Sequence, residues 1–426
     1  MLIIQNARLL GPLTEGYDGQ FADLWIEDGI IREIRPEGWT PSCSGAAAGT
    51  KPAGGTKPAG GTKTNAANGC GIPEGAQIID AAHHTVMPGL IDMHAHVYLK
   101  SLDFAKIKDL GPADSVLNAY IYAREYLKAG YTTVRDCGCM YNVTVAINDA
   151  ARRGELDAPR LISCGQILTP TETGNDTFGE LYIEADGPAQ VRAAARKQFK
   201  LKNDFIKYMV TGAFLNEKGS PGMTIATLDE MKAAVEIAEM KESYVCGHAH
   251  GTAGIKRAIE AGIRTIEHGV FIDDECIDLL QKKSDRCFLV PTGAITLACA
   301  GDTENMSANM QEKAEQYFED ERNNINHAYE AGLKLGFGSD LDMENFTANI
   351  GYEFTARTDY YHFKPMDILL QATKNSAEIL MLEDEIGTVK VGKCADLIIT
   401  DGNPDEDIRV MNRPLLHVIR GGKIIV

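Results

Sequence analysis

Short apolar runs, bounded by glycine, proline or polar residues, recur through the centre of the chain. Their length and their β-branched content are typical of buried strands rather than helices. The runs are VMPGLIDMHAH at 86–96, YTTVRDCG at 131–138, RLISCGQ at 160–166, DFIKYMVTG at 204–212, YVCGHAHG at 244–251, RTIEHGV at 264–270, CFLVPTG at 287–293 and LKLGFGSD at 333–340. The pattern therefore predicts eight strands along this part of the chain.

Segments with helical periodicity separate these runs. Three examples are ADSVLNAYIYAREYLKAG at 113–130, TLDEMKAAVEIAEMKES at 227–243 and TAGIKRAIEAG at 252–262. Gly130 and Gly262 end the first and third, where a helix C-cap favours glycine. Strands that alternate with helices indicate an α/β fold, and we expect a (β/α)8 TIM barrel over residues 86–380. In such barrels the active site collects at the carboxyl ends of the strands.

The two ends of the chain have a different pattern. Residues 1–85 and 381–426 read as short strands and tight turns, which predicts a small β-sandwich domain built from both termini. A low-complexity insert at about 43–76 contains two copies of TKPAGG, and its Gly, Pro, Ala and Lys content cannot form a core. We expect a flexible surface insertion, which is favoured over a functional tether.

Composition narrows the function classes. The 426 residues are 44% hydrophobic and 24% charged, as in ordinary globular proteins. The net charge of −18, with no basic block, argues against nucleic acid and anionic membranes as partners. The sequence predicts neither a signal peptide nor a membrane span. Ten cysteines without a CxxC pair indicate reduced thiols in a cytoplasmic protein, and a metal site at Cys137 and Cys139 is disfavoured.

Ionisable residues gather at the predicted strand ends. Alternate residues of a strand share a face, so His94 and His96 could reach one ion at about 2.0–2.1 Å. The other strand-end residues are Lys207, His248, His250, His268 and Asp340.

Each of these residues also has a structural explanation. His248 could be a core histidine and His268 a turn cap, while Asp340 could cap a helix and Lys207 could extend to solvent. Their joint position favours a metal site. A protonated lysine cannot bind a cation, but a lysine carbamate could bridge two metals about 3.5–4 Å apart.

The same motifs carry a family resemblance. PGLIDMHAH, the strand-four Lys207, HAHG, IEHG, GFGSD and the tail IGTVKVGKCADLIITDGNP resemble the amidohydrolase superfamily, in its Xaa-Pro dipeptidase, arginine carboxypeptidase and imidazolonepropionase-like branch. The resemblance implies a (β/α)8 barrel with a β-sandwich, and usually zinc. It also implies that His94 and His96 bind the more buried metal, that carbamylated Lys207 bridges, that His248 and His268 hold the second metal, and that Asp340 binds metal and transfers the proton. His250 is then left for substrate contact or for support of the ligands.

The leading functional hypothesis is a binuclear hydrolase in which a bridging hydroxide cleaves an amide bond of a dipeptide or N-acyl amino acid. A mononuclear deaminase is an alternative, although HAHGTAG lacks the Glu that family deaminases use. A cyclic-amide hydrolase and a non-catalytic scaffold are further alternatives, but the chain keeps all six expected ligands. The expected partner is a small-molecule substrate, and we expect a homo-oligomer.

The sequence leaves the substrate open. After strand three, relatives often carry a glycine-rich loop with a histidine, whereas this chain reads TPTETGND at 169–176. The loops after the predicted strands are expected to shape the pocket, and they carry charges of both signs. The charged residues are Lys100, Glu172, Asp176, Glu217, Lys218, Asp342 and Glu344.

Overall fold

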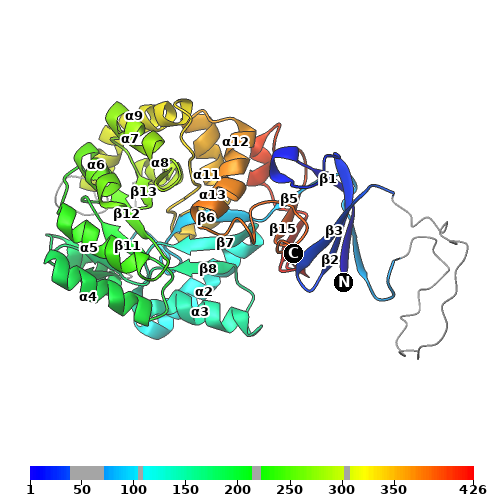
Figure 1. Cartoon of the computed structure of the whole chain (residues 1–426), viewed down its shortest axis with the longest axis horizontal. Helices are drawn as coiled ribbons and strands as arrows, with labels where there is room; N and C mark the ends of the chain where they lie inside the picture. The colour runs from blue at the N-terminus through cyan, green and yellow to red at the C-terminus, as the bar shows by residue number, and fades with distance from the viewer. Residues whose placement is uncertain (39–71, 104–108, 214–221, 302–307) are drawn as a thin grey trace, which may run out of the picture.

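The structure is a computed structural model, and it describes residues 1–38, 72–103, 109–213, 222–301 and 308–426. Most of the predicted insert at about 43–76 lies outside the described residues. The central strands and their helices form the larger body in Figure 1, and the strands from the two chain ends form a smaller body beside it.

The central strands form two parallel sheets. The first has the order β6 (Leu90–Ala95), β7 (Tyr131–Asp136) and β8 (Arg160–Ser163). The second has the order β10 (Tyr182–Glu184), β9 (Ile167–Thr169), β11 (Ile206–Met209), β12 (Val245–Ala249), β13 (Thr265–His268) and β14 (Phe288–Val290). Seven of the eight predicted runs contain one of these strands. The sequence pattern did not predict β9 and β10, which lie where we expected the loop after strand three.

The first predicted run, 86–96, divides into two strands at Gly89. β5 (Thr85–Pro88) pairs with β15 (Leu397–Thr400), whereas β6 pairs with β7. A Cβ atom on Gly89 would lie 2.2 Å from the Thr132 Oγ1, so only glycine fits between the two strands. At Gly89 the chain leaves the sheet formed by the two chain ends and enters the central strands.

The predicted eighth strand at 333–340 forms a single bridge, Leu289 with Leu335, instead of a ladder. Backbone hydrogen bonds continue along this segment, from the Gly336 N–H to the Leu289 carbonyl at 3.0 Å and from the Met93 N–H to the Phe337 carbonyl at 2.7 Å. Glycine contributes no side chain to stabilise a strand, which accounts for the short pairing. A TIM barrel is consistent with this arrangement, but the described strands do not form a closed barrel.

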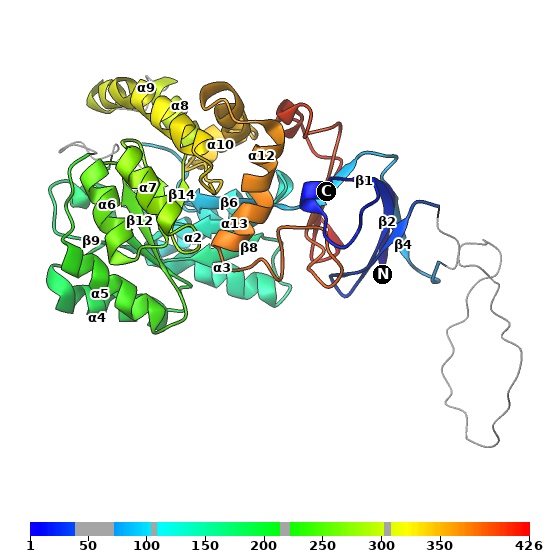
Figure 2. The same cartoon turned by 45° about the horizontal axis from the view of Figure 1, so that its top comes forward.

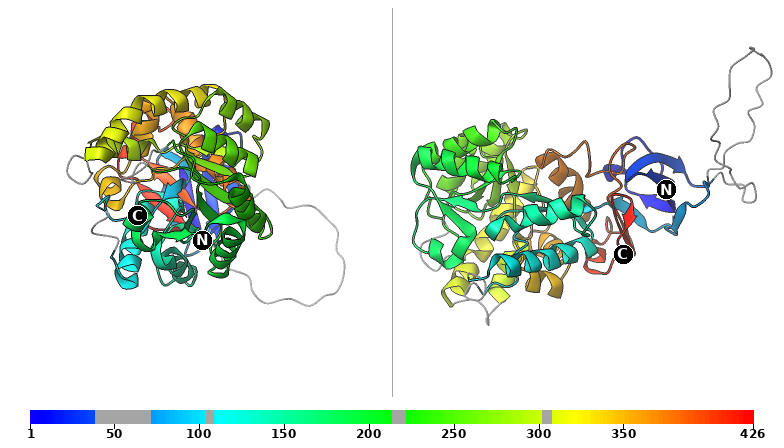
Figure 3. Two further views of the ribbon diagram at one scale, coloured as in Figure 1. Left: turned by 90° about the vertical axis from the view of Figure 1, so that its left-hand side faces the viewer. Right: turned by 90° about the horizontal axis from the view of Figure 1, so that it is seen from below.

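Helices surround the central strands in the left view of Figure 3. They are α2 (Pro112–Lys128), α3 (Val143–Arg152), α4 (Gly187–Lys200), α5 (Leu228–Glu239), α6 (Thr252–Ala261), α7 (Asp274–Lys282), α8 (Gly293–Gly301) and α9 (Ala308–Glu330). The three helices predicted by periodicity are confirmed as α2, α5 and α6. Gly262 is the C-cap of α6 with φ 92°, and Gly130 follows the C-cap of α2 with φ 93°.

The chain after the eighth predicted strand forms short helices against the central strands. They are α10 (Met343–Ala348), α11 (Tyr352–Thr355), the π-helix η4 (Ala356–Tyr360), α12 (Pro365–Leu370), the π-helix η5 (Gln371–Asn375) and α13 (Ser376–Ile379). Among the described helices, none combines the length and the apolar character that crossing a membrane requires.

Strands from both chain ends join in one sheet. Its members are β1 (Leu2–Leu9), β2 (Phe21–Glu27), β3 (Ile30–Pro36), β4 (Gln77–Asp80), β5, β15, β16 (His417–Arg420) and β17 (Lys423–Ile424). Ile4, Leu24 and Leu397 belong to the apolar core of this sheet. The structure confirms that both chain ends contribute to one β-structure. It does not confirm the predicted β-sandwich, because in the described residues these strands form one eight-stranded sheet.

We expect Gly338→Ala to lower the free energy of unfolding by about 1–3 kcal/mol, the usual cost of overpacking. The added Cβ would lie 2.7 Å from the His94 Cβ. Gly11→Ala is the matched control, because nothing lies within 4 Å of its added Cβ. Urea unfolding monitored by circular dichroism measures both variants, and equal stability of the two would contradict the close approach.

Candidate metal centre

A buried pocket lies at the carboxyl ends of the central strands. Its free volume is about 60 Å³, and all six predicted metal-site residues line it, namely His94, His96, Lys207, His248, His268 and Asp340. His94 and His248 are the last but one residues of β6 and β12, Lys207 lies in β11, and His268 ends β13. The structure therefore brings together side chains that the sequence separates by up to 246 positions, counting from residue 94 to residue 340.

The imidazole rings are close enough to share ions. The ring centroids of His94 and His268 are 4.7 Å apart, and those of His248 and His268 are 4.6 Å apart. His94 and His96 are 5.6 Å apart by the same measure. Ligand atoms of His94, His268 and Asp340 all lie within 4.8 Å of one another, and so do those of His248, His250 and His268.

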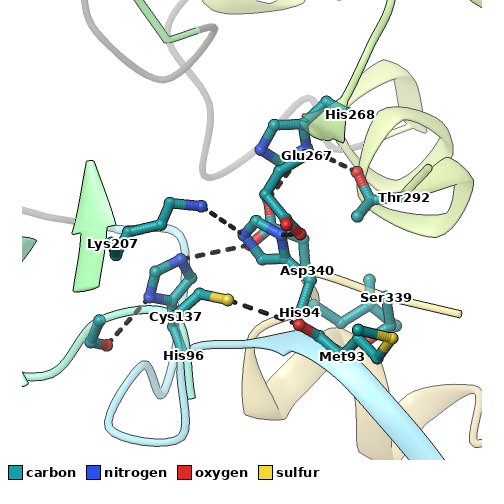
Figure 4. A network of polar contacts seen from close by, with 12 residues as sticks. Met93, His94, His96, Cys137, Lys207, Glu267, His268, Thr292, Ser339 and Asp340 are labelled. Atoms are coloured by element: carbon teal, nitrogen blue, oxygen red, sulfur yellow. Dashed lines mark hydrogen bonds and ion pairs between the residues drawn. The ribbon is translucent and has the colours of Figure 1, made fainter. Parts of the chain in front are cut away.

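Asp340 lies among these rings. Its Oδ1 is 3.7 Å from the His94 Nε2 and 3.5 Å from the His96 Nε2. The Asp340 N–H donates to the His94 carbonyl at 2.8 Å, which ties the aspartate to β6. Figure 4 shows this carboxylate pointing toward His94. Asp340 does not cap the following helix, because the N-cap of α10 is Asp342.

Burial controls the protonation of the cluster. Burial and then the nearby Lys207 lower the pKa of His96 to about 4, and burial is the main reason why the pKa of His268 lies well below its usual value. Neutral imidazoles offer a lone pair to a cation. Burial also raises the pKa of Asp340 to about 7, although Lys207 acts in the opposite direction.

Lys207 is fully inside this cluster and does not extend to solvent. Its side chain is buried, and its Nζ lies 3.4 Å from the His94 Nε2. Burial lowers the pKa of Lys207, but Cys246, Cys137 and Glu267 outweigh this effect and raise it. A protonated lysine cannot bind a cation, so Lys207 fits a metal site in the form of the carbamate that the sequence suggests.

The Nδ1 atoms of three histidines have partners that fix the rings. The His94 Nδ1 is 2.7 Å from the Glu267 Oε2, and the His268 Nδ1 is 2.8 Å from the Thr292 Oγ1. The His96 Nδ1 is 3.0 Å from the Gly138 carbonyl. Such contacts to the second ring nitrogen are common in histidines that bind metals.

Two ring nitrogens of the described residues that line the pocket lack hydrogen-bond partners. The His248 Nε2 and the His268 Nε2 have no hydrogen-bond partner among the described residues. An unsatisfied buried polar atom is costly and rare in folded proteins. Imidazole nitrogens with carboxylate oxygen form the ligand set that zinc prefers, so these residues fit divalent cations.

An ion pair beneath the pocket was not predicted from the sequence. The Arg135 Nη2 donates to the Glu267 Oε1 at 2.7 Å, and both side chains are fully buried. Burial by itself raises the pKa of Glu267, but Arg135 and the His94 contact outweigh it and hold that pKa well below its usual range. The sequence does carry a signal for this pair, because Arg135 and Glu267 are charged residues within two runs predicted to be buried strands.

Other predicted residues take other positions. His250 is buried beside His268, with ring centroids 4.8 Å apart, but it is not among the residues lining the pocket. Of the charged loop residues expected to shape the pocket, those that the structure describes do not line it, while Glu217 and Lys218 lie outside the described residues. Cys137 and Cys139 contact different partners, Cys246 and Thr144. The eight described cysteines are free, as predicted.

Comparison with known proteins identifies the family. Residues 85–425 match the amidohydrolase family. An ochratoxinase from Aspergillus niger is 28% identical over 373 residues, which span 80% of this chain and 75% of that protein.

Solved structures agree with this match. A prolidase complexed with N-methylphosphonate-L-proline has a TM-score of 0.82 at 27% identity and covers 100% of this chain and 99% of its own. A Xaa-Pro dipeptidase with bound methionine in the active site has a TM-score of 0.81 at 28% identity and covers 99% of each chain. The chain belongs to the amidohydrolase family, and it is a hydrolase acting on carbon–nitrogen bonds, as its motifs predicted.

We expect Arg135→Met to lower the free energy of unfolding by about 3–5 kcal/mol, because it leaves the Glu267 carboxylate buried without its cation. Arg153→Met is the matched control, since Arg153 pairs with Glu155 at the surface and should matter far less. Urea unfolding compares the two variants. Equal losses would show that the buried ion pair has no special role.

Proposed function

We propose that this amidohydrolase hydrolyses an amide or peptide bond of a dipeptide or an N-acyl amino acid with the help of two divalent metal ions. The observation that carries the proposal is the convergence of six side chains, four of them histidines, on one pocket. The prolidase and the Xaa-Pro dipeptidase named above support the substrate class.

The residues fit two ions, for which zinc is the expected metal. His94 and His96 would hold one ion, and His248 and His268 would hold the other. Lys207, as a carbamate, would lie between them, and Asp340 would complete the set. Bound ions would supply an activated water and polarise the carbonyl group of the substrate.

Asp340 is the residue proposed to move the proton. Its carboxylate oxygens lie within 4 Å of three histidines, and burial raises its pKa to about 7. A group with a pKa near neutrality can both accept and return a proton. An Asp340 Oδ atom would take the proton from the attacking water and deliver it to the leaving nitrogen.

The rest of the pocket is mostly apolar. Phe178 and Leu181 come from η3 (Asn175–Leu181), Tyr182 begins β10, and Tyr98 and Met209 also line the pocket. In the described lining, the charged side chains belong to the six proposed metal-site residues. We therefore propose that an apolar group flanks the scissile amide of the substrate, and that this wall excludes water from the reaction.

We further propose that the two central sheets belong to one (β/α)8 barrel. The Asp204 N–H donates to the Ser163 carbonyl at 2.7 Å at one junction, and the Gly336 N–H donates to the Leu289 carbonyl at the other. The deaminase alternative is less favoured, because no glutamate is among the described residues that line the pocket.

The function is tested by hydrolysis of a library of dipeptides and N-acyl amino acids. We expect turnover of members with apolar side chains next to the amide. Asp340→Asn is the control, and its kcat should fall by roughly 10²–10⁴ because an amide cannot accept the proton. Retention of wild-type kcat by Asp340→Asn would exclude the proposed proton transfer, and deamination without amide cleavage would favour the alternative.

Metal content tests the ligand set. Purified wild type should bind about two zinc ions per chain when bicarbonate is present, measured by elemental analysis. Lys207→Ala should lose at least one ion and its activity, and a short-chain carboxylic acid should partly restore both. Lys207→Arg should also fail, because guanidinium cannot bind a cation. Full metal content in Lys207→Ala would contradict the bridge.

A further inference from the structure

Thr292 contacts the ring of His268, one of the proposed metal ligands. It follows β14, and its Oγ1 lies 2.8 Å from the His268 Nδ1 in a fully buried position. Figure 4 shows this contact at the edge of the pocket. The direction of the hydrogen bond decides what His268 can do. If the Nδ1–H donates to Thr292, the Nε2 keeps its lone pair, whereas the reverse direction places the proton on Nε2.

The backbone on both sides of Thr292 is fixed by a buried ion pair. The Arg357 Nη2 donates to the carbonyl of Pro291 at 2.8 Å. The N–H of Ala294 donates to the Glu353 Oε2, also at 2.8 Å. Arg357 and Glu353 are themselves joined at 2.7 Å, and both side chains are buried. The ion pair therefore holds the turn that carries Thr292 by two hydrogen bonds, one to the residue before Thr292 and one to the second residue after it.

Two π-helical turns meet at this ion pair. Arg357 lies in η4 and also donates through Nη1 to Gln371 in η5. π-helical turns are rare in proteins, and those that occur are often found at functional sites. The turn after Thr292 begins α8, which lies beside α9 in Figure 2.

We propose that Thr292 is a positioning residue that holds His268 with its Nε2 free for a cation, and that the Glu353–Arg357 pair sets Thr292 for this task. The unpartnered Nε2 of His268 is the observation that directs this choice. The inference rests on the proposed function, because it concerns the residues that would hold the second ion. It adds three residues outside the six predicted ones, and none of the three lines the pocket.

Zinc affinity tests the role of Thr292. Metal-free protein is titrated with zinc against a chelating dye, and the melting temperature of the metal-free protein is measured in parallel. Thr292→Val keeps the shape but removes the hydroxyl, and we expect one of the two zinc sites, the one that contains His268, to lose about 10–100-fold in affinity. Thr292→Ser keeps the hydroxyl and should bind zinc within a few-fold of wild type.

Thr400→Val is the matched control. Thr400 is a buried threonine of β15 whose hydroxyl donates to the Gly402 carbonyl at 2.9 Å, remote from the pocket. This variant should lower the melting temperature without changing zinc affinity. Equal zinc affinity in Thr292→Val and Thr400→Val would overturn the proposal. Fewer than two ions bound by wild type would refute the metal centre itself, which is a different result.

The protonation of His268 gives a readout without metal. Two-bond ¹⁵N–¹H spectra of the metal-free protein should show the Nδ1–H form of His268 in wild type and in Thr292→Ser, and a mixture in Thr292→Val. An Nε2–H form in wild type would overturn the proposal. Arg357→Lys keeps the charge but loses the planar fork, so zinc affinity should fall in the same direction as in Thr292→Val. A lower melting temperature with unchanged zinc affinity in Arg357→Lys would limit the ion pair to stability.

Discussion

The buried contact from Arg135 through Glu267 to His94 connects the two central sheets through side chains. Arg135 lies in the three-stranded sheet and Glu267 in the six-stranded sheet, and the described residues show no ladder between these sheets. Arg135 also donates to the Met93 carbonyl and to the Thr265 hydroxyl. A carboxylate in this position is tolerated only because it is paired on both oxygens. The same carboxylate orients the ring of His94, so the stability of the interior and the geometry of the site depend on one side chain.

The sequence predicted what depends on local pattern. Apolar runs located seven of the central strands, and histidines at their ends were correctly expected to converge because parallel strands share one edge. The sequence did not predict which side chain supports which ligand. Glu267 contacts His94, and Thr292 contacts His268, only because the fold brings distant segments together. The residues next to Glu267 and Thr292 in the sequence do not identify these partners. The eighth predicted strand forms no ladder. Gly336 and Gly338 contribute no side chains to stabilise it, and their backbone lies directly against neighbouring side chains.

Backbone strain is another property that pattern alone could not reveal. His268 has φ 68° and Asp340 has φ 55°, in the left-handed region that residues other than glycine seldom adopt. Such positions cost about 1–3 kcal/mol and persist where the surroundings determine them fully. Here Thr292 fixes the His268 ring, and the His94 carbonyl fixes the Asp340 backbone. His268 and Asp340 are therefore held in these conformations by their neighbours rather than by their own backbone preference.

The pocket separates reaction chemistry from substrate choice. Five of the six proposed ligands lie in or directly after paired central strands, and Asp340 is tied to β6 by its hydrogen bond to the His94 carbonyl. The apolar wall comes largely from Phe178 and Leu181 in η3 and from Tyr182 at the start of β10. A loop can change its side chains without disturbing the strands, because its backbone makes few ladder contacts. Identity of 27–28% to a prolidase and a Xaa-Pro dipeptidase therefore supports a shared hydrolytic chemistry more strongly than a shared substrate. We propose that the segment from residue 175 to residue 182, which supplies most of this wall, takes part in the choice of substrate.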